Sequence, residues 1–143
     1  MQMAALLMIV FLMAQPGPPS MDQVRAEPNP ERRAKMAVEC AAAAERRAEA
    51  AYTGGNMAAT ASELKEMAAG IELAQKSLEQ SGKTPMRNPG PYKSAELRTQ
   101  EILVRLSDLE KRMDAEERTA IEAPRNRVQE IHDAWFDGIM RKK

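Results

Sequence analysis

The chain of 143 residues is poor in the residue types that most often build reactive or metal-binding sites. It has one cysteine, Cys40, and one histidine, His132, and aromatic residues make up only 3% of it. A single cysteine excludes a disulfide within the chain, and the histidine has no cluster of partners with which to hold zinc. Sites that need two histidines are excluded for the same reason. We therefore predict a non-enzymatic protein with no catalytic residues, no metal site and no cofactor.

The chain also lacks an excess of charge of either sign. Its 21 lysines and arginines balance its 21 aspartates and glutamates, and the formal net charge is zero. Proteins that bind the phosphate backbone carry a basic surface, so we do not expect nucleic acid as a partner. The expected partner is another protein or a second copy of this chain.

Alanine, glutamate, arginine, lysine and methionine are abundant, and all of them favour helix. The length suits one domain, and hydrophobic residues make up 43% of the chain. Large aliphatic residues are scarce after the first 14 residues, so the core should consist largely of alanine and methionine. The composition predicts an all-α fold, in which two antiparallel helical hairpins form a small four-helix bundle or a repeat-like stack.

The N-terminal segment is the most apolar part of the chain. Residues 3–14 read MAALLMIVFLMA and are followed by a proline-rich stretch. At about 1.5 Å per residue this run would span about 18 Å, which is short for a bilayer core of about 30 Å. Residues 1–14 are therefore predicted to be a signal peptide, and the protein to be exported to the periplasm or cell envelope. The alternative is an uncleaved anchor, which would be the only membrane contact. Residues 15–28 are predicted to be a flexible tether before a helical domain at residues 29–143.

Two helices are predicted in the first half of this domain. Asn29 and Pro30 suit the start of a helix over residues 30–52, and Gly54 and Gly55 suit its end. Asn56 suits the cap of a second helix over residues 57–80. The first helix has small apolar residues at alternating steps of three and four, which is typical of a buried helix face. These residues are Ala34, Ala37, Ala41, Ala44, Ala48 and Ala51.

The second half is predicted to form a loop and two more helices. Residues 83–92 contain three prolines and a glycine and should form a loop. A helix over residues 94–112 carries the richest apolar face, formed by Ile102, Leu106, Leu109 and Met113. Asp114 and Glu117 have the spacing of a capping box, so a helix over residues 115–140 should follow, with a kink at Pro124. The alternative is one long bent helix from residue 94 to residue 140.

The stretch from Ala44 to Leu78 resembles a tetratricopeptide-like helical hairpin. It has small residues before Tyr52, a Gly55–Asn56 turn, and an alanine at position 61 near the start of the second helix. Such hairpins bind peptides or proteins in a concave groove, so the resemblance implies protein binding and supplies no catalytic residues. The chain as a whole is similar to exported helical proteins of bacteria.

His132 is the one candidate for ligand chemistry, and its expected role is structural. We predict that it lies in the core or on the surface, with a hydrogen bond to Asp133 beside it. The alternative is a bundle that binds haem, a metal or a small apolar ligand. In that case His132 and Met36 are the candidate haem ligands.

Four other residues are candidates for contacts with a partner. Cys40 is predicted to be a small buried residue, or alternatively to form a disulfide between two chains. Tyr92 belongs to the proline-rich loop, which is interpreted as a spacer or as a recognition edge. Trp135 is expected in the core, whereas Phe136 could lie in the core or contact a partner. The resulting hypothesis is a protein that mediates protein–protein interaction or scaffolding.

Overall fold

A computed structural model describes residues 17–141, which form five α-helices and no strands. The helices are α1 (Met21–Ala26), α2 (Pro30–Thr53), α3 (Met57–Gln80), α4 (Pro89–Arg112) and α5 (Thr119–Met140). The predicted signal peptide or anchor at residues 1–14 lies outside the described residues. Within residues 17–141, every helix is too short or too polar to cross a bilayer.

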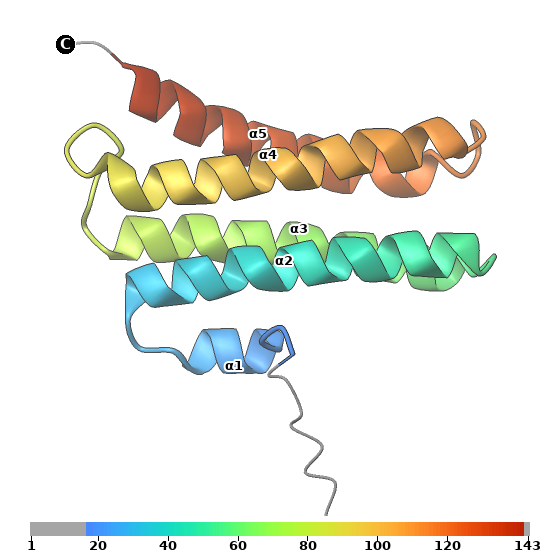
Figure 1. Cartoon of the computed structure of the whole chain (residues 1–143), viewed down its shortest axis with the longest axis horizontal. Helices are drawn as coiled ribbons and strands as arrows, with labels where there is room; N and C mark the ends of the chain where they lie inside the picture. The colour runs from blue at the N-terminus through green and yellow to red at the C-terminus, as the bar shows by residue number, and fades with distance from the viewer. Residues whose placement is uncertain (1–16, 142–143) are drawn as a thin grey trace, which may run out of the picture.

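The four long helices form two antiparallel hairpins, α2–α3 and α4–α5 (Figure 1). The hairpins stack with α2 beside α4 and α3 beside α5, so that neighbouring helices of different hairpins run in the same direction. Helices α3 and α4 follow each other in the chain but make little contact, because they lie on a diagonal of the bundle. The predicted all-α fold of two antiparallel hairpins is confirmed.

The α2–α3 hairpin begins and turns as its sequence indicates. The Asn29 side chain accepts a hydrogen bond from the Arg32 amide at 3.0 Å, and Asn56 accepts one from the Ala59 amide at 3.0 Å. Gly55 adopts a φ of 76° in the turn, a conformation that glycine reaches without strain. Five alanines of the predicted face are buried, namely Ala34, Ala37, Ala41, Ala44 and Ala48.

Small residues allow α2 and α3 to approach closely. A Cβ atom placed on Gly70 of α3 would lie 3.0 Å from the Ala41 Cβ atom and 3.1 Å from the Ala37 carbonyl oxygen. Both distances are shorter than most real Cβ contacts, so the close approach of α2 and α3 at this point favours a glycine facing an alanine.

Residues 21–26 correct the prediction of a flexible tether over residues 15–28. They form helix α1, which packs on α2 and buries Val24 completely. The Ser20 hydroxyl accepts from the Gln23 amide at 3.2 Å, and the Gln23 side chain accepts from the Ser20 amide at 2.9 Å. This is a capping box, and its Ser-x-x-Gln spacing was visible in the sequence.

Helix α4 begins at Pro89, five residues earlier than predicted, so the end of the predicted loop is helical. Prolines are tolerated in the first turn because the amides of that turn have no partner within the helix. Both Pro89 and Pro91 lie there. The four residues of the predicted apolar face, at positions 102, 106, 109 and 113, are all buried.

Helices α4 and α5 are separate, which decides against one long bent helix. The predicted capping box forms, because the Asp114 amide donates to Glu117 at 3.0 Å and the Glu117 amide donates to Asp114 at 2.8 Å. The four residues after Asp114 form turns, so α5 begins at Thr119, four residues later than predicted. Pro124 lies inside α5 and is buried.

Candidate functional site

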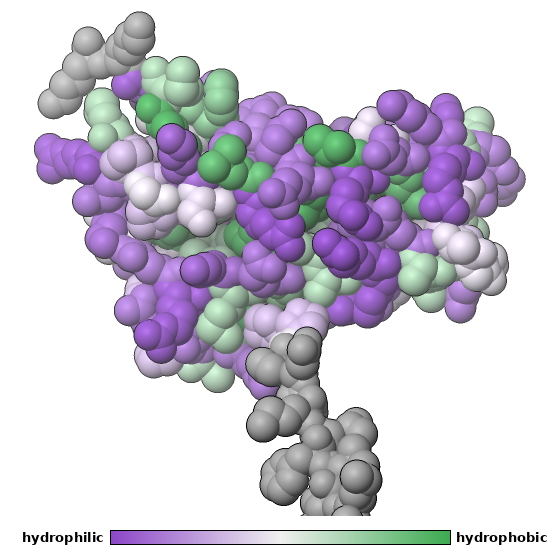
Figure 2. Space-filling model, in the orientation of Figure 1, coloured by the Kyte–Doolittle hydropathy of each residue, from purple (hydrophilic) through white to green (hydrophobic). Residues whose placement is uncertain are grey.

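A groove of about 620 Å³ lies between the N-terminal halves of α2 and α4. Its apolar surface includes Ala34, Val38, Leu78 and Ala95, all buried, and Leu97, which is 55% exposed. Figure 2 shows the face over these two helices as mostly hydrophilic, with hydrophobic patches between the charged side chains. A second hollow of about 510 Å³ lies between α3 and α5 and is lined largely by alanines.

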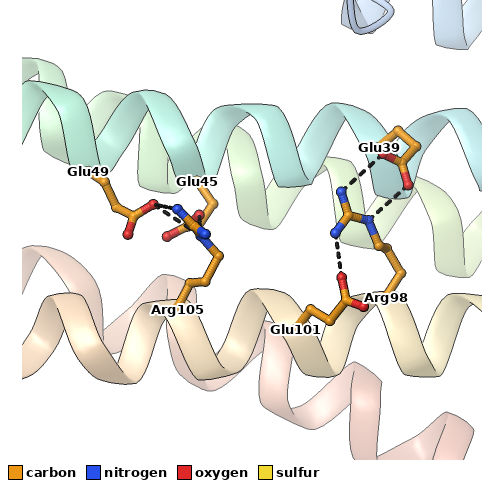
Figure 3. Close-up of polar contacts among 6 residues, drawn as sticks. All are labelled: Glu39, Glu45, Glu49, Arg98, Glu101 and Arg105. Carbon is orange, nitrogen blue, oxygen red and sulfur yellow. Dashed lines mark hydrogen bonds and ion pairs between the residues drawn. The ribbon is translucent and has the colours of Figure 1, made fainter.

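Charged side chains of both signs surround the apolar part of the groove. Arg98 of α4 binds the Glu39 carboxylate of α2 through two nitrogens, at 2.9 and 3.2 Å (Figure 3). Arg98 also donates to Glu101 at 2.5 Å. Lys35 on the same rim makes no ion pair with another described residue. The groove can therefore accept an apolar group and, beside it, a carboxylate.

A second arginine–glutamate cluster lies further along the α2–α4 contact (Figure 3). The Arg105 Nε atom donates to Glu45 at 3.1 Å and to Glu49 at 3.2 Å, and its Nη2 atom donates to Glu49 at 2.6 Å. The Glu45 side chain is fully buried, and its Oε1 atom has no hydrogen-bond partner. Burial raises the pKa of Glu45 to about 7, and the neighbouring Glu49 carboxylate also raises it, against the lowering effect of Arg105.

Glu45 was not among the residues expected on the buried face of α2. The spacing of Val38, Ala41 and Ala48 along α2 indicates that Glu45 lies on the buried face of this helix. Glu45 follows Ala41 by four residues and precedes Ala48 by three, which places it on the buried face of α2. A charged residue at such a position needs a partner from another helix, and Arg105 supplies it.

His132 is buried between α5 and α4 and has a carboxylate at each ring nitrogen. Its Nε2 atom lies 2.9 Å from Glu96 Oε1, and its Nδ1 atom lies 3.1 Å from Asp133 Oδ1. The hydrogen bond with His132 lowers the pKa of the Asp133 carboxyl, and a bond with Gln129 adds to this effect. The predicted contact between His132 and Asp133 is present, whereas the contact with Glu96 was not foreseen.

The structure does not bring together the two candidate haem ligands. Met36 lies on α2 and is half-buried, and His132 lies on α5, diagonally across the bundle. Both ring nitrogens of His132 already contact carboxylates. Among residues 17–141, no group of three or more histidine, cysteine, aspartate or glutamate side chains is placed to hold a metal ion.

The candidate contact residues divide into three that are buried and one that is exposed. Cys40 is 3% exposed, which leaves no access for a disulfide to another chain. Burial raises the pKa of its thiol, and the Glu66 carboxylate raises it further. Trp135 is in the core as expected. Phe136 is 46% exposed and stacks on the His132 ring, with 6.3 Å between ring centroids.

Tyr92 is buried, which corrects its assignment as a partner contact. Its hydroxyl donates to the Lys83 carbonyl oxygen at 2.7 Å and so joins the two ends of the predicted loop. The Pro85 side chain of this loop lies against Gly138 of α5, at 2.9 Å from a Cβ atom placed on that glycine. These contacts favour the spacer interpretation of the loop.

Comparison with protein-family models, with curated protein sequences and with solved structures finds no match to this chain. The candidate site therefore depends on its own geometry. Of the features above, the groove between α2 and α4 is the one that combines apolar residues with charged groups of both signs beside them.

Proposed function

We propose that this protein is a non-enzymatic interaction module that binds a short amphipathic helix of another protein in the groove between α2 and α4. The observation that carries the proposal is the groove itself, with its buried apolar floor and the exposed Leu97 at its edge. Amphipathic helices commonly bind by placing their apolar face in such a groove.

The charges around the groove specify the partner further. Glu39, Arg98 and Glu101 neutralise one another in part, whereas Lys35 is without an ion pair among the described residues. A partner helix with apolar residues on one face and an acidic residue at the edge of that face matches this arrangement. Opposite charges across the rim would orient the partner and speed its association.

We further propose that the interaction takes place in the periplasm or cell envelope. The support for this is the apolar run at residues 3–14 and the proline-rich stretch after it, which are typical of a secretory signal. Native mass spectrometry of the chain, expressed with its own N-terminus in a Gram-negative host, tests this proposal. Loss of residues 1–14 is the expected result, and an intact N-terminus would contradict cleavage.

Site-specific photo-cross-linking tests the groove. A photoreactive phenylalanine derivative at position 97 should cross-link to an amphipathic segment of one partner protein. The same group at position 104 should not, since Val104 is equally exposed on α4 but does not line the groove. Leu97→Asp should then reduce partner binding at least tenfold, and Val104→Asp should leave it unchanged. Equal cross-linking from both positions would contradict the proposal.

A carrier of a small apolar ligand is the second candidate function. The groove volume favours it, because about 300–1,000 Å³ is the usual size of a small-molecule pocket. A ligand mass retained in the native mass spectrum, and lost in Leu97→Asp but not in Val104→Asp, would favour the carrier over the interaction module.

A further inference from the structure

The contact between α2 and α4 is one of two that join the hairpins, the other being between α3 and α5, and two arginine–glutamate clusters lie along the α2–α4 contact (Figure 3). We call Glu39, Arg98 and Glu101 the outer cluster. We call Glu45, Glu49 and Arg105 the inner cluster. Each consists of one guanidinium and two carboxylates, so with every group ionised each carries one net negative charge.

The two clusters differ in their access to water. In the outer cluster, the Glu39 and Glu101 side chains are 46% and 64% exposed, so water screens the excess charge. In the inner cluster, Glu45 is fully buried and Glu49 is 24% exposed. Arg105 is 44% exposed, so water reaches the edge of this cluster but does not reach the Glu45 carboxylate, and it cannot stabilise a negative charge on Glu45 directly.

When both carboxylates of the inner cluster are ionised, its geometry leaves one negative charge without a positive partner. Both Oε2 atoms accept from the same Arg105 nitrogen, so the two carboxylates are close neighbours. The Glu45 Oε1 atom is buried without a partner, one of only two such side-chain atoms among residues 17–141. The charged groups that contact Glu45 are Glu49 from its own helix and Arg105 from α4, and α3 and α5 contribute none.

We propose that the inner cluster is a proton-binding site that controls how tightly α2 lies against α4. With Glu45 protonated, one positive and one negative charge remain in the cluster, and α2 lies firmly against α4. When that proton leaves, an ionised Glu45 remains buried in the contact, so a contact in which α2 and α4 separate and water reaches this carboxylate becomes relatively more favourable. The groove for the proposed partner lies along the same contact, but this inference does not depend on its occupant.

The direction of the pH effect follows from the two states of Glu45. Its pKa is about 7 in the folded protein, against an ordinary value of 4.5. Between these two pH values the folded protein holds a proton that the unfolded chain has lost, so stability falls as pH rises. Above about pH 7 both states are ionised, and Glu45 contributes no further pH dependence.

Urea unfolding of the full chain at pH 5, 6, 7 and 8 tests the proposal. The measured quantity is the ratio of the wild-type unfolding constant to that of Glu45→Gln. This ratio should rise about tenfold per pH unit from pH 5 to just below pH 7 and then level off. Glu39→Gln is the matched control from the outer cluster and should show the wild-type dependence. A constant ratio between wild type and Glu45→Gln across this range would overturn the proposal.

Two further measurements keep the test independent of the folding of Glu45→Gln. A ¹³C NMR titration of the wild-type Glu45 carboxyl should have its midpoint near pH 7, and Glu49→Gln should lower that midpoint. A midpoint near 4.5 in the wild type would overturn the proposal.

Spin labels at positions 35 and 97, in a Cys40→Ala background, should show a broader distance distribution at pH 8 than at pH 5.5. Equal distributions would contradict the effect on the helix contact.

Discussion

The first helices of the two hairpins, α2 and α4, are equally long, but they are held in the bundle by different means. The buried face of α2 consists mainly of alanines, with Glu45 among them, whereas α4 buries Ile102, Leu103, Leu106 and Leu109. An alanine buries little apolar area, so α2 gains its packing from a close approach to α3. Helix α4 gains it from the size of its side chains. The α2–α3 contact therefore depends on small residues, whereas the packing of α4 depends on large ones.

The largest expected effect is the loss of a large side chain from α4. Leu106 is fully buried, and Leu106→Ala should lower the free energy of unfolding by about 2–5 kcal/mol, because it removes apolar contacts and leaves a cavity. Urea denaturation measures the change. Val104→Ala on the exposed face of the same helix is the control, with an expected change below about 0.5 kcal/mol. A loss below about 1 kcal/mol for Leu106→Ala would mean that α4 does not depend on its large residues.

The contact between α2 and α3 should respond to the opposite change. Gly70→Val adds atoms where the Ala41 side chain and the Ala37 carbonyl oxygen are already close, and should destabilise the protein by about 1–3 kcal/mol. Gly90→Val in the first turn of α4 is the control, since nothing lies within 4 Å of a Cβ atom there. Thermal unfolding of both variants compares them. Equal melting temperatures would show that the α2–α3 contact is looser than the structure indicates.

The smallest expected effect concerns the two helix starts. The Asn29 side chain accepts a hydrogen bond from an α2 amide, whereas Asn88, at the same position before α4, makes no such bond. Asn29→Ala should therefore cost about 1 kcal/mol, and Asn88→Ala should cost close to nothing. Urea unfolding at pH 7 measures both. A larger loss of stability for Asn88→Ala than for Asn29→Ala would contradict this prediction.

Much of the fold could be predicted from local sequence signals. The helix class, the start of α2 at Pro30, the start of α3 at Met57 and the buried face of α4 follow from capping residues and from apolar spacing, which act over a few neighbouring residues. The errors arose where a local signal was read too strictly. Prolines at positions 89 and 91 were taken to exclude a helix, although the first turn accepts them.

The groove and the polar contacts between helices were less predictable, because their residues come from segments far apart in the sequence. Glu45 and Arg105 are 60 residues apart, and His132 and Glu96 are 36 residues apart. The residues that flank each of these side chains in the sequence do not indicate which distant residue it contacts. The burial of Tyr92 was missed for the same reason, since the stacking of hairpins decides which aromatic residues remain on the surface.

The sequence by itself determined that this chain is helical, where its long helices lie, and that α2 presents small residues to its neighbour. These properties depend on backbone preferences and on spacing along a single helix. Only the tertiary structure decided that α2 lies beside α4, that a groove opens between them, and that a buried glutamate shares one arginine with a second glutamate. Those features depend on the register between helices, which is set by the packing of whole faces and cannot be read from either helix alone.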